Sequence, residues 1–331
     1  MTMNDDDLIG DATAARPRLD GYGDPVRERQ YGRIALRVLG VLAVLALLYY
    51  PIGMLLIHNI DDKTELSHQV NEGESHAVAA AAALITLETD ENRWTANDPF
   101  FLPGAALDNM PNYQQGIVYA LSRFAIEMSD QIGRVRGSSQ VDEDLDKAAG
   151  RLKFPGNIWY FDFGTSLAPT TPSEQQYRAA RRNFLNYNKR LAAGNASFER
   201  RADNLQATLE RISADLGSSS AVIDQKIKES GLLIDTQADD VFYQTKGRLY
   251  GYYQLIKALG LDFGKIIEER ELTAAWDQML DSLRVASQMQ PLVVVNGAPD
   301  SQMMPSHLAS QGFYLLRSRT QLKEIANILL K

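Results

Sequence analysis

The sequence predicts an all-α protein: one transmembrane helix followed by a bundle of long helices with coiled-coil-like packing. Three observations support this fold class. A run of 20 residues, Val38 to Ile57, contains no charged side chain. Beyond it, apolar residues recur every three or four positions, which is typical of amphipathic helices, and strand-like alternation is nearly absent. One later segment, Phe198 to Leu216, alternates steps of four and three like the a/d seam of a coiled coil.

The composition limits the classes of function. The 331-residue chain is 45% hydrophobic, enough for a sizeable core. Its net charge is −8, and no dense Lys/Arg cluster carries interleaved aromatic residues, so nucleic-acid binding is not expected. The chain has no cysteine, which excludes disulfides, thiolate nucleophiles and zinc–cysteine sites and fits a compartment outside the reducing cytosol.

The chain divides into three predicted regions. Residues 1–32 are rich in Asp, Gly, Pro and Arg without hydrophobic periodicity, which predicts a disordered cytoplasmic tail. Residues 33–58 form the predicted transmembrane helix, because 20 apolar residues at about 1.5 Å each span the roughly 30 Å of a bilayer core. A buried core helix is rarely apolar on every face, and a signal peptide would be shorter and followed by a cleavage site. Residues 59–331 form the helical domain.

Charges flanking the span predict its orientation. Basic side chains, among them Arg33 and Arg37, precede it, whereas acidic side chains dominate after it. The positive-inside rule then places the N-terminus in the cytoplasm and residues 59–331 in the periplasm of a bacterial inner membrane. Tyr49 and Tyr50 are expected at the outer interface as aromatic anchors. The lipid bilayer is therefore the first predicted partner.

The apolar periodicity places the helices of the domain. We expect helices over residues 74–89, 111–134, 141–152, 172–193, 198–216, 221–230, 238–259, 263–290 and 305–330. Thr171 is the expected N-cap of the fourth, with Glu174 as its capping-box partner. Gly217 and the serines after it are expected to end the fifth, and residues 292–295 to form an extended connection.

Searches for chemical motifs predict neither a metal site nor a cofactor. The four histidines lack the spacing of metal ligands. No nucleophile–base signature and no phosphate-binding loop of a known kind occurs. An enzymatic activity is therefore less expected than a binding role.

The stretch NDPFFLPGAALDNMPNYQQG, residues 97–116, holds the candidate catalytic residues. Asp98 and Asp108 are flanked by aromatic residues, and a pair of carboxylates could cleave peptidoglycan glycosidic bonds. Asn-Asp-Pro is also a turn sequence and Asp108 precedes a helix, so a structural role is favoured for both. Phe100 and Phe101 are expected to clamp this loop onto the bundle, and they are candidate partner contacts.

The turn GRVRGSS is a second candidate binding site. Arg134 and Arg136, with Ser138 and Ser139 at the start of a helix, could hold a phosphate or carboxylate. Helix termini explain the same residues: arginines favour the C-terminal end of one helix, and Ser139 suits the N-cap of the next. The structural interpretation is favoured here too.

Four long strings carry a family resemblance. WTANDPFFLPGAALDNMPNYQQGIVYAL, IGRVRGSSQVDEDLDKAAGRL, TPSEQQYRAARRNFLNYNKRLA and FERRADNLQATLERISADLGSSSAVI are similar to the bacterial family described as domain of unknown function 2333. The resemblance implies a single-pass inner-membrane protein of a Gram-negative bacterium with a periplasmic domain. It brings no activity, cofactor or catalytic residue.

The sequence thus predicts a non-enzymatic envelope scaffold or partner-binding module, acting through a protein partner or self-association. Two alternatives stay open. One is a peptidoglycan-acting enzyme that uses the carboxylates described above. The other is a periplasmic ligand sensor, which the single span and the lack of a cytoplasmic output domain disfavour.

Overall fold

The computed structural model describes residues 25–132, 141–161, 164, 167–229 and 235–331. Within these residues the regular secondary structure is helical, apart from one isolated β-bridge between Asn296 and Ser306. The predicted all-α fold class is confirmed. Contacts divide the chain between Tyr49 and Tyr50 into two compact units.

Ten α-helices follow one another in the described residues. They are α1 Pro25–Ile57, α2 His76–Thr86, α3 Asn109–Glu127, α4 Glu143–Leu152, α5 Ser173–Ala192, α6 Ala202–Lys228, α7 Thr236–Asp262, α8 Gly264–Glu269, α9 Thr273–Ser287 and α10 His307–Leu329. Three short helices accompany them: the π-helices η1 Leu87–Glu91 and η3 Met128–Ile132, and the 3-10 helix η2 Pro103–Ala106.

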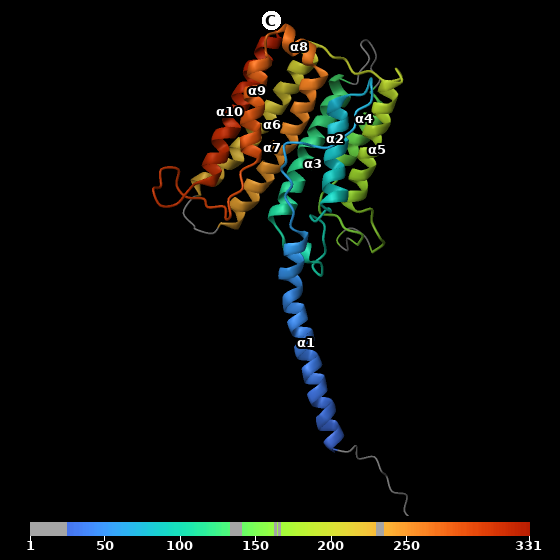
Figure 1. The fold of residues 1–331 in the computed structure, drawn as a ribbon, viewed down its shortest axis with the longest axis vertical. Helices are drawn as coiled ribbons and strands as arrows, with labels where there is room; N and C mark the ends of the chain where they lie inside the picture. Colours follow the sequence, from blue (N-terminus) through green and yellow to red (C-terminus); the bar gives the residue numbers. More distant parts are fainter. Residues whose placement is uncertain (1–24, 133–140, 162–163, 165–166, 230–234) are drawn as a thin grey trace, which may run out of the picture. The chain divides into compact units, whose positions relative to one another are not determined.

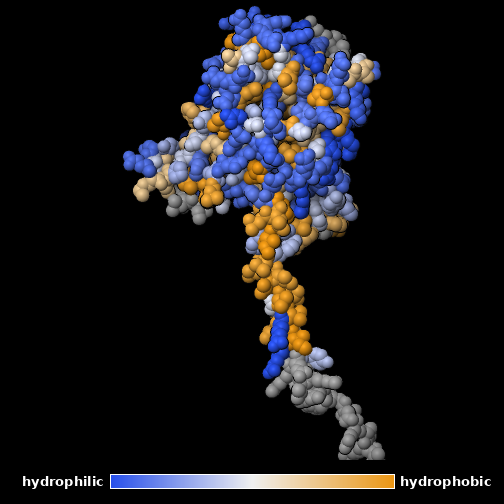
Figure 2. All heavy atoms as spheres, viewed as in Figure 1, coloured by the Kyte–Doolittle hydropathy of each residue, from blue (hydrophilic) through white to orange (hydrophobic). Residues whose placement is uncertain are grey.

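Helix α1 carries the apolar run. By length and composition, its residues Arg33–Ile57 are suited to crossing a membrane, and it is the one described helix of which this is true. Its large apolar side chains are exposed, and Figure 2 shows the continuous hydrophobic surface that results. The helix begins at Pro25, ahead of the predicted span, and Pro51 lies within it.

The second unit is a helical bundle with α7 at its centre (Figure 1). Helices α2, α3, α4 and α5 lie on one side of α7, and α6, α9 and α10 on the other. The most extensive packing joins α3 to α7 and α6 to α10. Figure 2 shows a mostly polar surface over the visible face of this bundle.

Helix α6 carries the predicted coiled-coil-like seam, and its seam residues are core residues. Leu205, Leu209 and Leu216 are fully buried where α6 packs on α10. The predicted end of the helix at Gly217 is wrong, because α6 continues to Lys228. A side chain at Gly217 would meet the Arg319 guanidinium at 2.9 Å, so the glycine makes room for a helix neighbour instead of ending a helix.

Two other local predictions are wrong. Thr171 is not an N-cap: the N-cap is Pro172, which has no side-chain cap, and Glu174 instead accepts a hydrogen bond from Asn97 Nδ2 at 2.6 Å. The single helix predicted over 263–290 is two helices, α8 and α9. The break contains Glu271 in the left-handed region at φ 56°, which no helix interior allows.

Helix α2 is fixed to the end of α7 by one carboxylate. Asp262, the last residue of α7, accepts hydrogen bonds from Ser75 Oγ at 2.7 Å, His76 N at 3.0 Å and Ala77 N at 2.9 Å. These donors include backbone N–H groups of the first turn of α2, which have no partner within the helix. A side chain from another helix therefore caps α2 and fixes its register on α7.

Glycines let α3 and α7 approach closely. A Cβ atom at Gly247 would lie 2.0 Å from the Tyr113 carbonyl oxygen, and one at Gly116 would lie 2.2 Å from the Gln244 carbonyl oxygen. Because both obstacles are backbone atoms, a side chain at either position must separate the helices.

We expect Gly247→Ala to lower the free energy of unfolding by about 1–3 kcal/mol through overpacking. Gly150→Ala is the matched control, because a Cβ there meets nothing within 4 Å and alanine favours a helix. Denaturant unfolding of the full chain in detergent micelles measures both variants. Equal stability of the two would contradict the close approach of α3 and α7.

Candidate functional site between the strap and the bundle

Helices α1 and α2 are joined by an extended segment, residues 58–69, which we call the strap. Both the strap and the last residues of α1 belong to the same compact unit as the bundle. The strap runs along the surface formed by α3 and α7, and buried side chains of these helices bind it. It is therefore held against the bundle along its length, in contrast to a flexible linker.

Three side chains donate hydrogen bonds to backbone carbonyls of the strap. Tyr113 Oη donates to the Asp61 carbonyl at 2.9 Å, and Tyr250 Oη donates to the Lys63 carbonyl at 3.1 Å. Gln254 Nε2 donates to the same Lys63 carbonyl at 2.9 Å. All three donor residues are buried. Since an extended segment has no partners of its own for these carbonyls, the bundle supplies them.

An ion pair fixes the centre of the strap. Asp62 Oδ2 lies 2.7 Å from Nζ of Lys246, whose side chain is completely buried in α7. The ammonium also donates to the Met289 carbonyl at 2.9 Å, and Gln290 Nε2 donates to Asp62 Oδ2 at 2.7 Å. Burial lowers the pKa of Lys246, and the hydrogen bond and charge of Asp62 oppose this shift. The strap therefore provides the anion that a buried lysine requires.

A buried acid lies beneath the strap on the π-helix η1. The side chain of Glu88 is buried, and neither carboxylate oxygen has a hydrogen-bond partner among the described residues. Burial raises its pKa to about 8, although the nearby amides of Gln114 and Asn92 favour the charged form. Asn92 Oδ1 in turn accepts a hydrogen bond from Asn59 of the strap at 2.7 Å. Single π-turns of this kind recur at functional sites.

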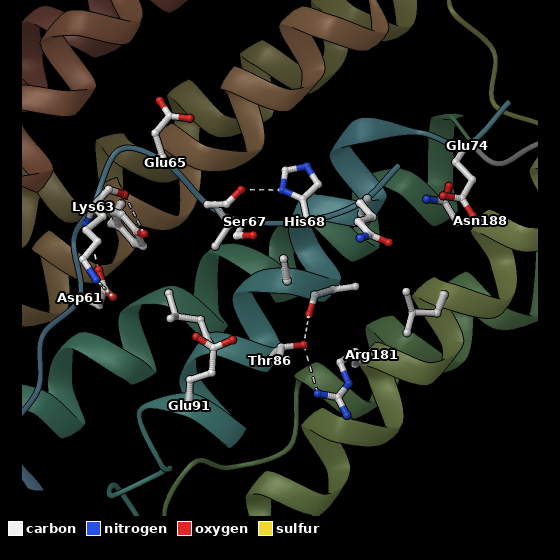
Figure 3. A pocket seen from close by; sticks show the side chains of 18 residues that line it. Asp61, Lys63, Glu65, Ser67, His68, Glu74, Thr86, Glu91, Arg181 and Asn188 are labelled. Atoms are coloured by element: carbon white, nitrogen blue, oxygen red, sulfur yellow. Dashed lines mark hydrogen bonds and ion pairs between the residues drawn. The ribbon is translucent and has the colours of Figure 1, made fainter. Parts of the chain in front are cut away.

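A cavity of about 580 Å³ lies between the strap, α2 and α5 (Figure 3). This volume is within the range of small-molecule sites, which is about 300–1,000 Å³. In Figure 3, Arg181 of α5 reaches Thr86 of α2, with Nη1 donating to Oγ1 at 3.1 Å, and His68 of the strap lies across the cavity from them. Charged groups of both signs line it, including Lys63 and Glu91. The cavity can therefore receive a polar ligand or a polar segment of a protein.

The two predicted carboxylates have structural partners. Asp98 accepts two hydrogen bonds of 2.9 Å from Arg93 Nη2, and a Cβ at Gly104 would lie 2.0 Å from its Oδ2. Burial raises the pKa of Asp98, and the charge of Arg93 opposes this shift. Asp108 is the N-cap of α3 and accepts from Asn109 N at 2.9 Å. These contacts agree with the favoured structural roles, and a catalytic role of the pair stays a prediction.

Another predicted feature of this loop is corrected. The loop contains the 3-10 helix η2 over residues 103–106. Phe100 does not clamp the loop onto the bundle, because its side chain is 83% exposed, and Phe101 is 47% exposed. Their role as partner contacts stays a prediction.

The remaining predicted site residues lie elsewhere. Arg134, Arg136, Ser138 and Ser139 are outside the described residues. The side chains of Arg33, Arg37 and Tyr49 are exposed on α1. Tyr50 donates a hydrogen bond from Oη to the Phe100 carbonyl, which connects α1 to the loop of Asp98 and Asp108.

The residues that bind the strap were not predicted. A signal exists for Lys246, because it is a charged residue within the aromatic stretch VFYQTKGRLYGYYQLI, and it is buried in α7. The sequence pattern contains no such signal for Glu88, because a glutamate near the end of a predicted helix is common. In the part of the chain that the structure describes, no three His, Asp or Glu side chains are grouped so that they could hold a metal ion.

Comparison with known proteins identifies the family. The model of the family described as uncharacterised protein conserved in bacteria, domain of unknown function 2333, matches residues 56–238 and 234–331. No curated protein and no solved structure matches the chain. The matched ranges contain the strap, the cavity and the whole bundle, and they confirm the resemblance seen in the sequence. The chain belongs to this uncharacterised bacterial family, domain of unknown function 2333.

Proposed function

We propose that the protein is a scaffold of the bacterial envelope: α1 anchors it in the inner membrane, and the bundle binds a partner in the periplasm. The binding of the strap by buried side chains is the observation that supports this proposal most. A flexible tether would let the bundle move freely, whereas the Asp62–Lys246 ion pair fixes the strap to α7 within the unit that begins at Tyr50. A rigid connection of this kind suits a scaffold better than a freely moving domain.

The cavity beside the strap is the proposed partner site. Charged side chains of both signs line it and the strap forms one wall, so an occupant would contact the segment that connects the bundle to α1. The same geometry suits the ligand sensor, since a ligand there would touch the strap. The peptidoglycan-acting enzyme has less support, because Asp98 and Asp108 both engage structural partners.

The partner site can be tested by photo-crosslinking in intact cells. A photoreactive residue replaces Ser67 or Gln69, which are exposed strap positions at the cavity, and Glu324 on α10 serves as an exposed control. We expect one discrete adduct that is shared by the two strap positions and absent at Glu324. An adduct of twice the chain mass would identify self-association. No adduct from either strap position would contradict the scaffold proposal.

The anchor and its orientation have a separate test. Alkaline phosphatase, which folds only outside the cytoplasm, is fused after Lys331, and membranes are extracted with alkaline carbonate. We expect an active fusion that stays in the membrane fraction. An inactive fusion would contradict the orientation, and release by carbonate would contradict the anchor.

A further inference from the structure

An exposed aromatic cluster lies on the loops at one end of the bundle. Phe100 and Phe101 come from the loop before α3, and Trp159 and Tyr160 from the loop before α5. Their ring centroids form a continuous series: Phe100 to Phe101 at 5.5 Å, Phe101 to Trp159 at 5.5 Å and Trp159 to Tyr160 at 5.9 Å. Phe100, Phe101 and Tyr160 are exposed to solvent. Exposed aromatic residues that gather from two separate loops indicate an interaction surface.

The two loops are tied together by buried polar contacts. Asn97 Nδ2 donates to the Ile158 carbonyl at 2.8 Å and to Glu174. Trp94 Nε1 donates to the Gly156 carbonyl at 2.8 Å. These contacts hold the two loops together, so the aromatic cluster is exposed although the loops that carry it are well packed.

The aromatic cluster is connected to α1. Tyr50 Oη donates to the Phe100 carbonyl, and a Cβ at Gly53 would lie 2.3 Å from Pro103 Cγ, so the loop packs directly on the helix. Tyr50 precedes the last residue of α1, Ile57, by seven positions. At about 1.5 Å per residue, Phe100 lies roughly 10 Å below the end of the apolar helix. The 25 residues of Arg33–Ile57 are longer than the roughly 30 Å hydrocarbon core of a bilayer, so the last turns of a spanning α1 extend into the outer interface, and the aromatic cluster lies beside them.

We propose that the aromatic cluster inserts into the outer interface of the membrane that α1 crosses, so that the bundle is fixed to the bilayer at a second point. The inference rests on the proposed anchoring of α1. Aromatic residues favour this region, where an apolar ring meets lipid and a polar edge meets water. Lipid is the occupant that the position favours, because the loop contacts α1 inside its apolar run. A protein partner at the same residues is the competing outcome.

Trp159 is a natural reporter of this insertion. The chain has three tryptophans, and the other two, Trp94 and Trp276, are 3% and 4% exposed. The full chain is reconstituted into phosphatidylcholine vesicles whose acyl chains are either unmodified or brominated near the headgroup. Bromine quenches tryptophan emission at short range, and each bundle faces its own leaflet whichever way the chain inserts. We expect bromination to reduce the emission, and Trp159→Phe to remove most of that reduction.

Matched variants test the aromatic cluster itself. Phe100→Ser combined with Phe101→Ser should lower the quenching of Trp159 at least twofold. Phe313→Ser on α10, where the side chain is 60% exposed, should leave the quenching unchanged. Flotation of the vesicles after carbonate treatment reports the anchor independently. A chain that floats but shows equal emission in both kinds of vesicle would overturn the proposed insertion of the aromatic cluster and leave the anchoring by α1 intact. The same result is expected if the aromatic cluster binds a protein and not lipid. A chain that does not float overturns the anchoring proposal.

Discussion

Asp62→Ala is expected to destabilise the bundle by about 3–5 kcal/mol, the cost of leaving a buried charge without its partner. The Lys246 side chain is completely buried, and Asp62 is its carboxylate at 2.7 Å. Without Asp62, the ammonium keeps the Met289 carbonyl as its one acceptor among the residues that the structure describes. Denaturant unfolding of the full chain in detergent micelles measures the loss.

Two further variants separate this effect from the loss of an ordinary ion pair. Glu65 pairs with Lys257 at 2.9 Å but is 86% exposed, so Glu65→Ala should cost no more than about 1 kcal/mol. Combining Asp62→Ala with Lys246→Met removes both charges and should recover much of the stability. The interpretation fails if Asp62→Ala costs no more than Glu65→Ala.

Glu88 is expected to make the stability of the protein fall as the pH rises. Burial raises its pKa in the folded state to about 8, whereas a glutamic acid in the unfolded chain has a pKa of 4.5. Between these values the folded state binds more protons than the unfolded state, so the free energy of unfolding decreases with increasing pH. At a pH below 4.5, Glu88 does not lower the free energy of unfolding. At a pH above about 8, it lowers the free energy of unfolding by its full amount, on the order of 5 kcal/mol.

Glu88→Gln should flatten this dependence, because the amide has the size of the protonated acid and does not ionise. Thermal unfolding of the full chain in micelles, at about pH 5 and about pH 9, gives the comparison across the titration. Glu91→Gln on the same π-helix is the control, because Glu91 is exposed and its substitution should preserve the wild-type slope. A wild-type protein with equal stability at both pH values would show that Glu88 does not carry a buried proton.

The fold was largely predictable because helices leave a periodic signal. The a/d spacing of the seam predicts the buried face of α6, since burial on one side of a helix imposes the pattern. The end of α6 does not follow from the sequence, because a glycine such as Gly217 can either end a helix or make room for a neighbouring residue. Gly217 serves a close approach of Arg319, and the sequence around a glycine does not tell a helix end from a close contact.

The site was much less predictable than the fold. The strap is an irregular segment of mostly polar residues, and its conformation depends on side chains of α7 nearly two hundred positions later, such as Lys246 and Tyr250. No local sequence pattern predicts contacts between segments so far apart. Asp98 and Asp108 are candidate catalytic residues because carboxylates near aromatic residues resemble an active site. Their partners, Arg93 and the first turn of α3, are close in the sequence, and the turn and N-cap signals of the sequence favour these structural roles.

The most direct test of the account is the distance between the end of α1 and the bundle. Because the chain has no cysteine, Leu56→Cys and Arg317→Cys introduce two spin labels at exposed positions without further substitutions. Pulsed electron resonance on the full chain in lipid nanodiscs then gives the distribution of distances. We predict one narrow peak that broadens when Asp62→Ala is added. A broad distribution in the chain with intact Asp62 would show that the strap is a flexible tether and contradict the proposed scaffold.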